Sequence, residues 1–513
     1  MPPRKGFEKV RSGCVTCKVK CDEARPACLR CRAGSRTCGG YRAAPPGSFS
    51  WNALLRGRPP AVPSPARDGA ELRGLDFFRC VVAPALAGSP LGGAFWTRPV
   101  LQLAAREPAA RHAVLAISAL YERLDPSSAS RLDGDGDGDG VALRHYNRAL
   151  RRVATSTRLG ADAVLSLSVL FTCVEFLRAD VPAAVEHCRH GIRILGSVGR
   201  AAPPDVRAIV RHLGIFPFFF GATLADFPAP ARDPERPGRR IDRVAQAAEA
   251  LDGLMSGSVR LVRAFDPFRL GMADVAGVPC SLASAQRELY RDLDAWYAAF
   301  SAFRETVGSD SGDQALLRML EMRWHVCKIW VCIALCREEI LCDSYRRQFE
   351  RIVELARQDA SSQEVSGPGN RIFFKFEMGL SPLLHFVVMK CRFLRLRLEA
   401  LELLRVRGCV RESLWDATIM YAIGCRLIER EHGIEFPQRL IEGGLENVRS
   451  NDPLPSNTQR IRDSYLEEET QLYVDYDGLR VTRRRIIFFV RHEVRDEIVR
   501  VPDWIYLPEK SHG

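Results

Sequence analysis

The chain has 513 residues, a net charge of +12, 46% hydrophobic residues and 27% charged residues. This length predicts two or more folding units, and the composition is typical of a protein with a sizeable apolar core. The sequence has no apolar run of the roughly 18 residues that a transmembrane helix needs and no apolar signal core at its N-terminus, so we expect neither a membrane span nor secretion.

The N-terminal stretch concentrates both cysteine and positive charge. Residues 14–38 hold six of the chain's 17 cysteines, and residues 1–38 carry ten basic side chains against three acidic ones. Without an export signal the thiols should be reduced, and clustered reduced thiols indicate a metal site. A small basic module on a nearly neutral body indicates a polyanionic partner, which we interpret as nucleic acid.

The six cysteines form two similar halves. The first half has the spacing Cys14-x2-Cys17-x3-Cys21 and the second has Cys28-x2-Cys31-x6-Cys38. Zinc prefers four thiolates in a tetrahedron, with Zn–S distances of about 2.3 Å. Six sulfurs cannot fill two separate tetrahedra, but they can fill two tetrahedra that share two bridging thiolates. The spacing therefore favours a compact binuclear cluster.

The stretch RSGCVTCKVKCDEARPACLRC closely resembles the fungal binuclear zinc-cluster transcription factors, over roughly residues 9–41. The resemblance implies two zinc ions held by six cysteines. In that family the first and fourth cysteines bridge the metals; here these are Cys14 and Cys28, with Cys17 and Cys21 completing one site and Cys31 and Cys38 the other.

The resemblance also implies a function. It predicts a nuclear, sequence-specific regulator of RNA polymerase II transcription that binds double-stranded promoter DNA and transcriptional coregulators, and it leaves a homodimer open. Members of the family often control metabolic or secondary-metabolite genes. Our candidates for DNA contact are Lys9, Arg11, Lys18 and Lys20. The sequence contains no complete catalytic motif, so we expect no enzymatic activity.

The spacing departs from the family between Cys17 and Cys21. The family has six residues there, on the segment that it places in the major groove, whereas this chain has only Lys18-Val19-Lys20. If residues 14–21 were helical, Cys14 and Cys21 would lie ~10.5 Å apart along the axis. Two sulfurs on one zinc lie within ~4 Å, so the helix must break within three residues.

Three explanations of the short spacer stay open. The module could be a weakened or single-zinc finger, it could close the short loop around both metals, or the sequence could lack three residues of the natural chain. The first explanation carries a different function, that of an interaction protein with a defective finger. Such a protein would act through its helical body without binding DNA.

The rest of the chain predicts a mainly all-α protein in three parts: a zinc-cluster module at 1–42, a proline-rich linker at 43–74 and an all-helical domain at 75–505. Segments such as EPAARHAVLAISALYE and LFTCVEFLRAD resemble the fungal-specific transcription factor domain, which is regulatory. Apolar residues recur at helical spacing in 97–124, where Pro108 should open a second helix, and in 141–156, 161–180, 182–197, 314–341, 386–406 and 415–433.

Two C-terminal segments are ambiguous. We interpret 480–501 as a helix, although its pattern also fits strands. Residues 464–479 mix acidic and apolar side chains, which suits either an amphipathic surface helix, the interpretation we favour, or a coactivator-binding segment.

Two further groups of ligand-type residues have simpler explanations. His325 lies among four cysteines (Cys327, Cys332, Cys336 and Cys342), and this group favours core packing over a second metal site. His187 and His190 are spaced i, i+3 without a third ligand nearby in the sequence, so we expect surface or capping roles.

Overall fold

A computed structural model describes residues 14–17, 21, 26–40, 69–87, 93–124, 138–156, 159–227, 240–308, 312–363, 373–407, 409–434, 453–474, 480–492 and 497–508. The chain divides into two compact units, Met1–Pro65 and Ala66–Gly513. The described part of the first unit contains α1 (Leu29–Ala33). In the second unit α3 begins at Gly69, so the helical region starts before residue 75 and takes in the end of the expected linker.

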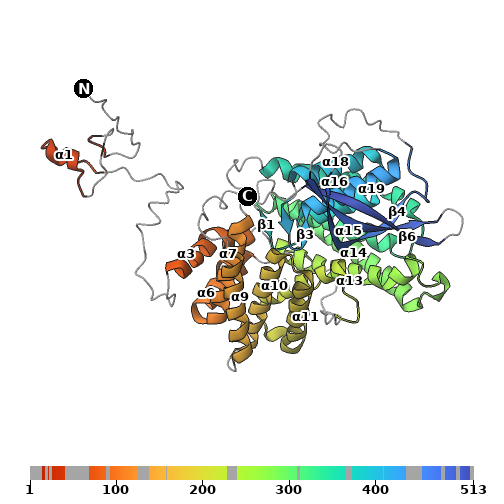
Figure 1. Ribbon diagram of the computed structural model, residues 1–513, viewed down its shortest axis with the longest axis horizontal. Coiled ribbons are helices and arrows are strands. Elements are labelled where there is room, and N and C mark those ends of the chain that lie inside the picture. Colours follow the sequence, from red (N-terminus) through yellow and green to blue (C-terminus); the bar gives the residue numbers. More distant parts are fainter. Residues whose placement is uncertain are drawn as a thin grey trace. The chain divides into compact units, whose positions relative to one another are not determined.

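The second unit is mainly helical, which confirms the predicted fold class (Figure 1). Its first helices are α3 (Gly69–Phe77), η1 (Phe78–Val82), α4 (Ala83–Leu86), α5 (Gly93–Thr97), α6 (Pro99–Arg106), α7 (Pro108–Leu124), α9 (Gly138–Thr155), α10 (Ala161–Arg178), α11 (Val181–Val198), η2 (Gly199–Ala201), α12 (Pro204–Leu213) and η3 (Phe216–Phe220). They are followed by α13 (Val244–Arg269), η4 (Val275–Gly277), α14 (Cys280–Thr306), α15 (Gln314–Ile333), η5 (Glu339–Tyr345), α16 (Arg346–Gln363), α17 (Leu380–Lys390), α18 (Leu394–Arg407) and α19 (Ala417–His432).

Most helices lie where the periodicity predicts them. Pro108 opens α7, because a proline in the first turn loses no helical hydrogen bond. Two predicted segments end or break early. Helix α15 ends at Ile333, well before residue 341, and the 386–406 segment is interrupted after α17, where Cys391 takes an extended conformation with ψ of 131°.

The apolar core lies on two sides of α15. One cluster includes Trp96, Trp296 and Phe300, and α15 contributes Trp324 to it. A second cluster gathers side chains of α15 to α19, Phe349 among them. Figure 1 shows α15 among α13, α14 and α16 accordingly. Among the described residues, no helix combines the length and the apolar character that crossing a bilayer would take.

The C-terminal region is a sheet, so the helix predicted at 480–501 and the surface helix favoured at 464–479 are both wrong. Strands β4 (Ile461–Val474), β5 (Arg480–Arg491) and β6 (Ile498–Pro508) pair antiparallel in that order. Three consecutive residues of β5, from Ile486 to Phe488, are buried. The strand therefore lacks the alternation that identifies strands in a sequence. A smaller sheet joins β1 (Phe374–Lys375), β2 (Arg411–Glu412) and β3 (Trp415–Asp416).

A buried carboxylate fastens the larger sheet to the helices. Glu431 on α19 pairs with Arg392 at 3.1 Å and with Arg397 on α18 at 2.6 Å, and all three side chains are 0% exposed. The backbone N–H of Ile461, where β4 begins, donates to the same carboxylate at 2.6 Å. The carboxylate of Glu431 therefore joins the first residue of β4 to the helices. Removing one partner of such a buried ion pair leaves the other charge uncompensated, which is strongly destabilising.

Candidate metal centre

Both halves of the cysteine module begin with the same local turn. In the first half residues 15–17 form a turn, and the backbone N–H of Cys17 donates to Cys14 Sγ at 3.3 Å. In the second half the N–H of Cys31 donates to Cys28 Sγ, also at 3.3 Å. In each Cys-x2-Cys unit, therefore, the backbone N–H of the second cysteine donates to the sulfur of the first, and the turn brings the two cysteines together.

The described residues of the first half, 14–17 and 21, contain a turn and no helix. The backbone N–H of Cys14 donates to Cys21 Sγ at 3.4 Å, so the first and third cysteines of this half are in contact. A continuous helix over residues 14–21 would hold these two cysteines about 10.5 Å apart, so the contact is incompatible with it. The second half is helical instead, because Cys28 is the N-cap of α1 and its side chain accepts the N–H of Cys31.

Hydrogen bonds hold the two halves together. The N–H of Val15 donates to the carbonyl of Gly40 at 2.8 Å. The hydroxyl of Thr16 donates to the carbonyl of Thr37 at 3.1 Å and accepts the N–H of Gly39 at 2.8 Å. The C-terminal end of the module thus pairs with its first turn and brings Cys38 next to the other thiols.

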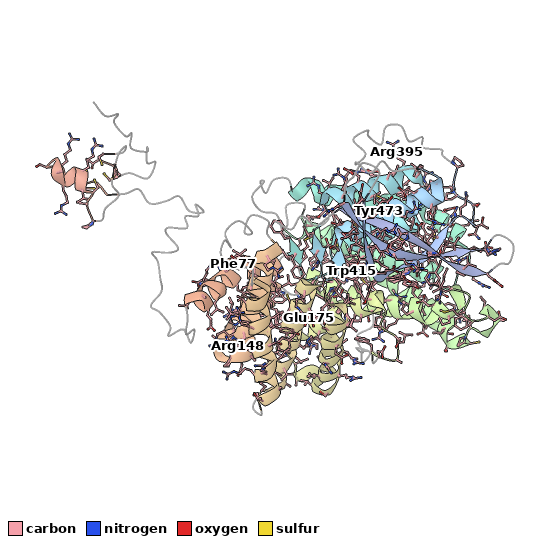
Figure 2. The ribbon with its side chains drawn as sticks, in the orientation of Figure 1. Phe77, Arg148, Glu175, Arg395, Trp415 and Tyr473 are labelled. Carbon is pink, nitrogen blue, oxygen red and sulfur yellow. The ribbon has the colours of Figure 1, made fainter. Side chains whose placement is uncertain are left out.

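The sulfurs form two overlapping groups of four. Cys14, Cys17, Cys21 and Cys28 make one group and Cys14, Cys28, Cys31 and Cys38 the other, each with all sulfurs within 4.8 Å of one another. Cys14 and Cys28 belong to both groups, and their sulfurs are 3.8 Å apart. Two thiolates on a tetrahedral zinc with 2.3 Å bonds are separated by about 3.8 Å, so the donor set and its spacing fit zinc. The module and its thiols are drawn in Figure 2.

Burial and hydrogen bonding set the charge of these thiols. The backbone N–H of Cys17 lowers the pKa of Cys14 to about 6, whereas the hydrogen bond with Cys14 raises the pKa of Cys17 to about 12. Burial raises the pKa of Cys28 and of Cys31. Four of the six cysteines are at most 5% exposed (Cys14, Cys21, Cys28 and Cys31). Ionising all six thiols in a buried cluster is costly, and bound divalent cations would stabilise the thiolates.

The structure brings together all six cysteines that the sequence selected. The DNA-contact candidates Lys9, Arg11, Lys18 and Lys20 lie outside the described residues. Sequence reasoning attached no importance to Thr16, whose hydroxyl links the two halves; a lone threonine between two cysteines carries no signal of that role.

The other ligand-type groups in the sequence do not form comparable centres. Cys327 and Cys342 are buried in different apolar clusters, and none of the four cysteines near His325 belongs to a ligand group among the described residues. His187 accepts or donates a 2.7 Å hydrogen bond with the hydroxyl of Tyr146. Cys327 and Cys342 thus pack in the core as predicted, whereas Cys332 and Cys336 are only half-buried. His187 is half-buried against Tyr146 and does not have the surface or capping role that we expected.

A six-thiol centre with two shared sulfurs, in the same chain as a mainly helical second unit, agrees with what the resemblance to the fungal zinc-cluster transcription factors implies. Comparison with known proteins points to the same class. The chain is 28% identical over 383 residues to the aspercryptin biosynthesis cluster-specific transcription regulator atnN of Emericella nidulans. The aligned region covers 63% of this chain and 59% of that protein.

Two further relatives carry similar names. The chain is 31% identical over 242 residues to the Zn(2)-C6 fungal-type transcription factor afumD of Aspergillus fumigatus, covering 45% of this chain and 63% of that protein. It is 27% identical over 234 residues to the transcription regulator lscL of Purpureocillium lilacinum, covering 42% of this chain and 56% of that protein. The matches thus span less than two thirds of each relative's length. No protein-family model and no solved structure matches the chain.

The resemblance inferred from the cysteine block is confirmed: the chain resembles fungal Zn(2)-C6 transcription regulators. The names of the relatives support a role in transcription regulation and point away from an enzyme.

Proposed function

We propose that this protein is a zinc-dependent, sequence-specific DNA-binding regulator of RNA polymerase II transcription that acts in the nucleus. The observation that carries the proposal is the pair of four-thiol groups sharing Cys14 and Cys28. This arrangement supports two zinc ions in a module whose described residues offer few other apolar contacts. In our proposal residues 1–42 bind promoter DNA, and the helical body regulates activity, as a homodimer or with coregulators.

In this proposal the zinc ions are structural and supply four-coordinate crosslinks between the two halves. Cys14 and Cys28 would bridge both ions, Cys17 and Cys21 would complete one site, and Cys31 and Cys38 would complete the other. The Cys17 and Cys31 N–H groups that donate to the bridging sulfurs would stabilise their negative charge. Structural zinc of this kind makes folding of a small module depend on the metal.

The basic side chains supply the attraction to DNA. Lys18 and Lys20 lie in the spacer of the first half, and Lys9 and Arg11 precede it. Basic residues this dense neutralise phosphates and release counterions, which makes binding sensitive to salt. The spacer is three residues long, so few side chains from it can reach base edges in the major groove.

Salt dependence tests this proposal. Binding of the full zinc-loaded chain to duplex DNA is measured by fluorescence anisotropy at a series of salt concentrations, for the wild type and for Lys18→Ala/Lys20→Ala. If both lysines contact phosphates, the variant's log–log slope should be shallower by about 1.8, at 0.9 per contact. Arg151→Ala/Arg152→Ala removes the same charge from exposed positions of α9 and should leave the slope unchanged.

The short spacer favours a second candidate, an interaction protein that does not bind DNA and regulates transcription through its helical body. The same titration separates the two functions. DNA binding that is undetectable with zinc fully loaded would support the second candidate. Binding with the same slope in both double variants would show instead that Lys18 and Lys20 make no phosphate contacts.

A further inference from the structure

Three helices at the start of the second unit bring together a second set of metal-ligand side chains. Glu71 on α3, His112 on α7 and His145 on α9 place their ligand atoms within 4.8 Å of one another. The Nδ1 atoms of the two histidines are 3.0 Å apart, and their rings lie 5.2 Å apart with an interplanar angle of 34°. All three side chains are half-buried, so an ion and a water molecule can reach them.

Two imidazoles and a carboxylate form a common ligand set for zinc, with a water as the fourth ligand. Zn–N bonds of 2.0–2.1 Å separate two nitrogens on a tetrahedral ion by about 3.4 Å. The observed nitrogens are slightly closer than that, and a small rotation of each half-buried ring would open the gap. The competing explanation is a plain N–H···N hydrogen bond between the two histidines.

Helix α3 is anchored less deeply than its neighbours, since Leu75 and Phe77 pack against the main apolar cluster but are only half-buried. It contains no buried residue. It touches α7 through the close approach of Gly74 to Leu115, and through the hydroxyl of Ser118, which donates to the carbonyl of Gly74 at 3.0 Å. The ion pair of Arg73 with Glu122 is largely exposed on the arginine side. An ion bound at Glu71 would therefore add a strong anchor near the start of α3.

The charges around these three residues act on a cation in opposite directions. Arg111, Arg144 and Arg148 act on the histidines and repel a cation, while Glu71 attracts it. Figure 2 labels Arg148 on α9. Burial lowers the pKa of both His112 and His145, which favours the neutral rings that metals bind.

We propose that Glu71, His112 and His145 bind a zinc ion that holds α3 against α7 and α9. This site is separate from the six-cysteine centre and does not depend on the function proposed for it. Because α3 is the first described helix of the second unit, the bound ion would order the start of that unit.

The zinc content of the full chain tests the proposal. Native mass spectrometry compares the wild type with His145→Ala and with His190→Ala, a control whose ring is 55% exposed. His145→Ala should hold one zinc ion fewer than the wild type, and His190→Ala should match the wild type. The difference does not depend on how many ions the cysteines hold.

Hydrogen exchange of the α3 amides gives a second readout. It should be faster in His145→Ala than in the control, because the ion no longer anchors the helix. The cobalt-substituted proteins should keep the same thiolate-to-metal absorption in all three forms, since no cysteine is changed.

A second variant keeps the proposal testable if His145→Ala does not fold. Glu71 lies half-buried on a helix without buried residues, so Glu71→Gln should fold normally. Its zinc titration should show one site weakened at least about tenfold, the lower end of what changes around metal ligands cost. Equal zinc content in folded His145→Ala and wild type, or an unchanged titration of Glu71→Gln, would overturn the proposal and leave a histidine–histidine hydrogen bond.

Discussion

Replacing Cys28 with serine should remove two zinc ions from the cysteine centre, whereas replacing Cys38 with serine should remove one. Cys28 belongs to both groups of four sulfurs, so its loss leaves each group with three thiols. Cys38 belongs to one group only, and its loss leaves the group of Cys14, Cys17, Cys21 and Cys28 complete. Serine is a poor zinc ligand because its hydroxyl does not ionise as a thiol does.

The two variants are well matched. Cys28 also caps α1 by accepting the N–H of Cys31, and serine is among the preferred N-cap residues. A Cys28→Ser protein therefore keeps the cap, and its loss of zinc reports on metal binding alone. Structural zinc contributes roughly 10–16 kcal/mol of apparent binding free energy in zinc-finger peptides, far more than a cap does.

The assay is zinc per full-length chain by native mass spectrometry, expressed as the difference from wild type. The expected differences are two ions for Cys28→Ser and one ion for Cys38→Ser. Equal losses in the two variants would refute the shared-sulfur arrangement. Loss of a single ion in both would favour a single-zinc finger.

Two further predictions concern the second unit. Glu431→Gln should lower the free energy of unfolding by about 3–5 kcal/mol, because it leaves the buried Arg397 without its carboxylate partner and leaves Arg392 with Glu339 alone. Glu402→Gln, in an exposed ion pair, should cost under about 1 kcal/mol in the same denaturant titration. Burial lowers the pKa of His325 to about 4, so the neutral ring stabilises the fold above pH 6.5 and this contribution is lost as the pH falls towards 4. Between pH 7 and pH 4 the wild type should therefore lose roughly 3 kcal/mol more stability than His325→Phe, and parallel pH profiles would contradict this.

The helices could be predicted because their signal is local. In α10 and α11 the apolar spacing alone gives the element and nearly its bounds. The sheet could not be predicted in that way, since the pairing of Ile461 with Val490 joins residues far apart in the chain. The sequence carries one local signal of the hairpin, the dipeptide Asp477-Gly478, a pair typical of hairpin turns, which lies in the sequence between the ends of β4 and β5.

The cysteine centre could be predicted from spacing, because metal ligands of this kind come in short, regular patterns. The ligand group of Glu71, His112 and His145 could not, since three separate helices contribute to it. The same holds for the buried Glu431, whose partners Arg392 and Arg397 lie on another part of the chain.

The central claim is zinc-dependent recognition of a DNA sequence, and selection from random duplexes tests it most directly. The full-length chain is incubated with a library of randomised duplex DNA, once loaded with zinc and once after chelation, and the bound DNA is sequenced. The account predicts that a defined motif is enriched with zinc and lost after chelation. Binding without enrichment of any motif, or the same enrichment in both states, would contradict it.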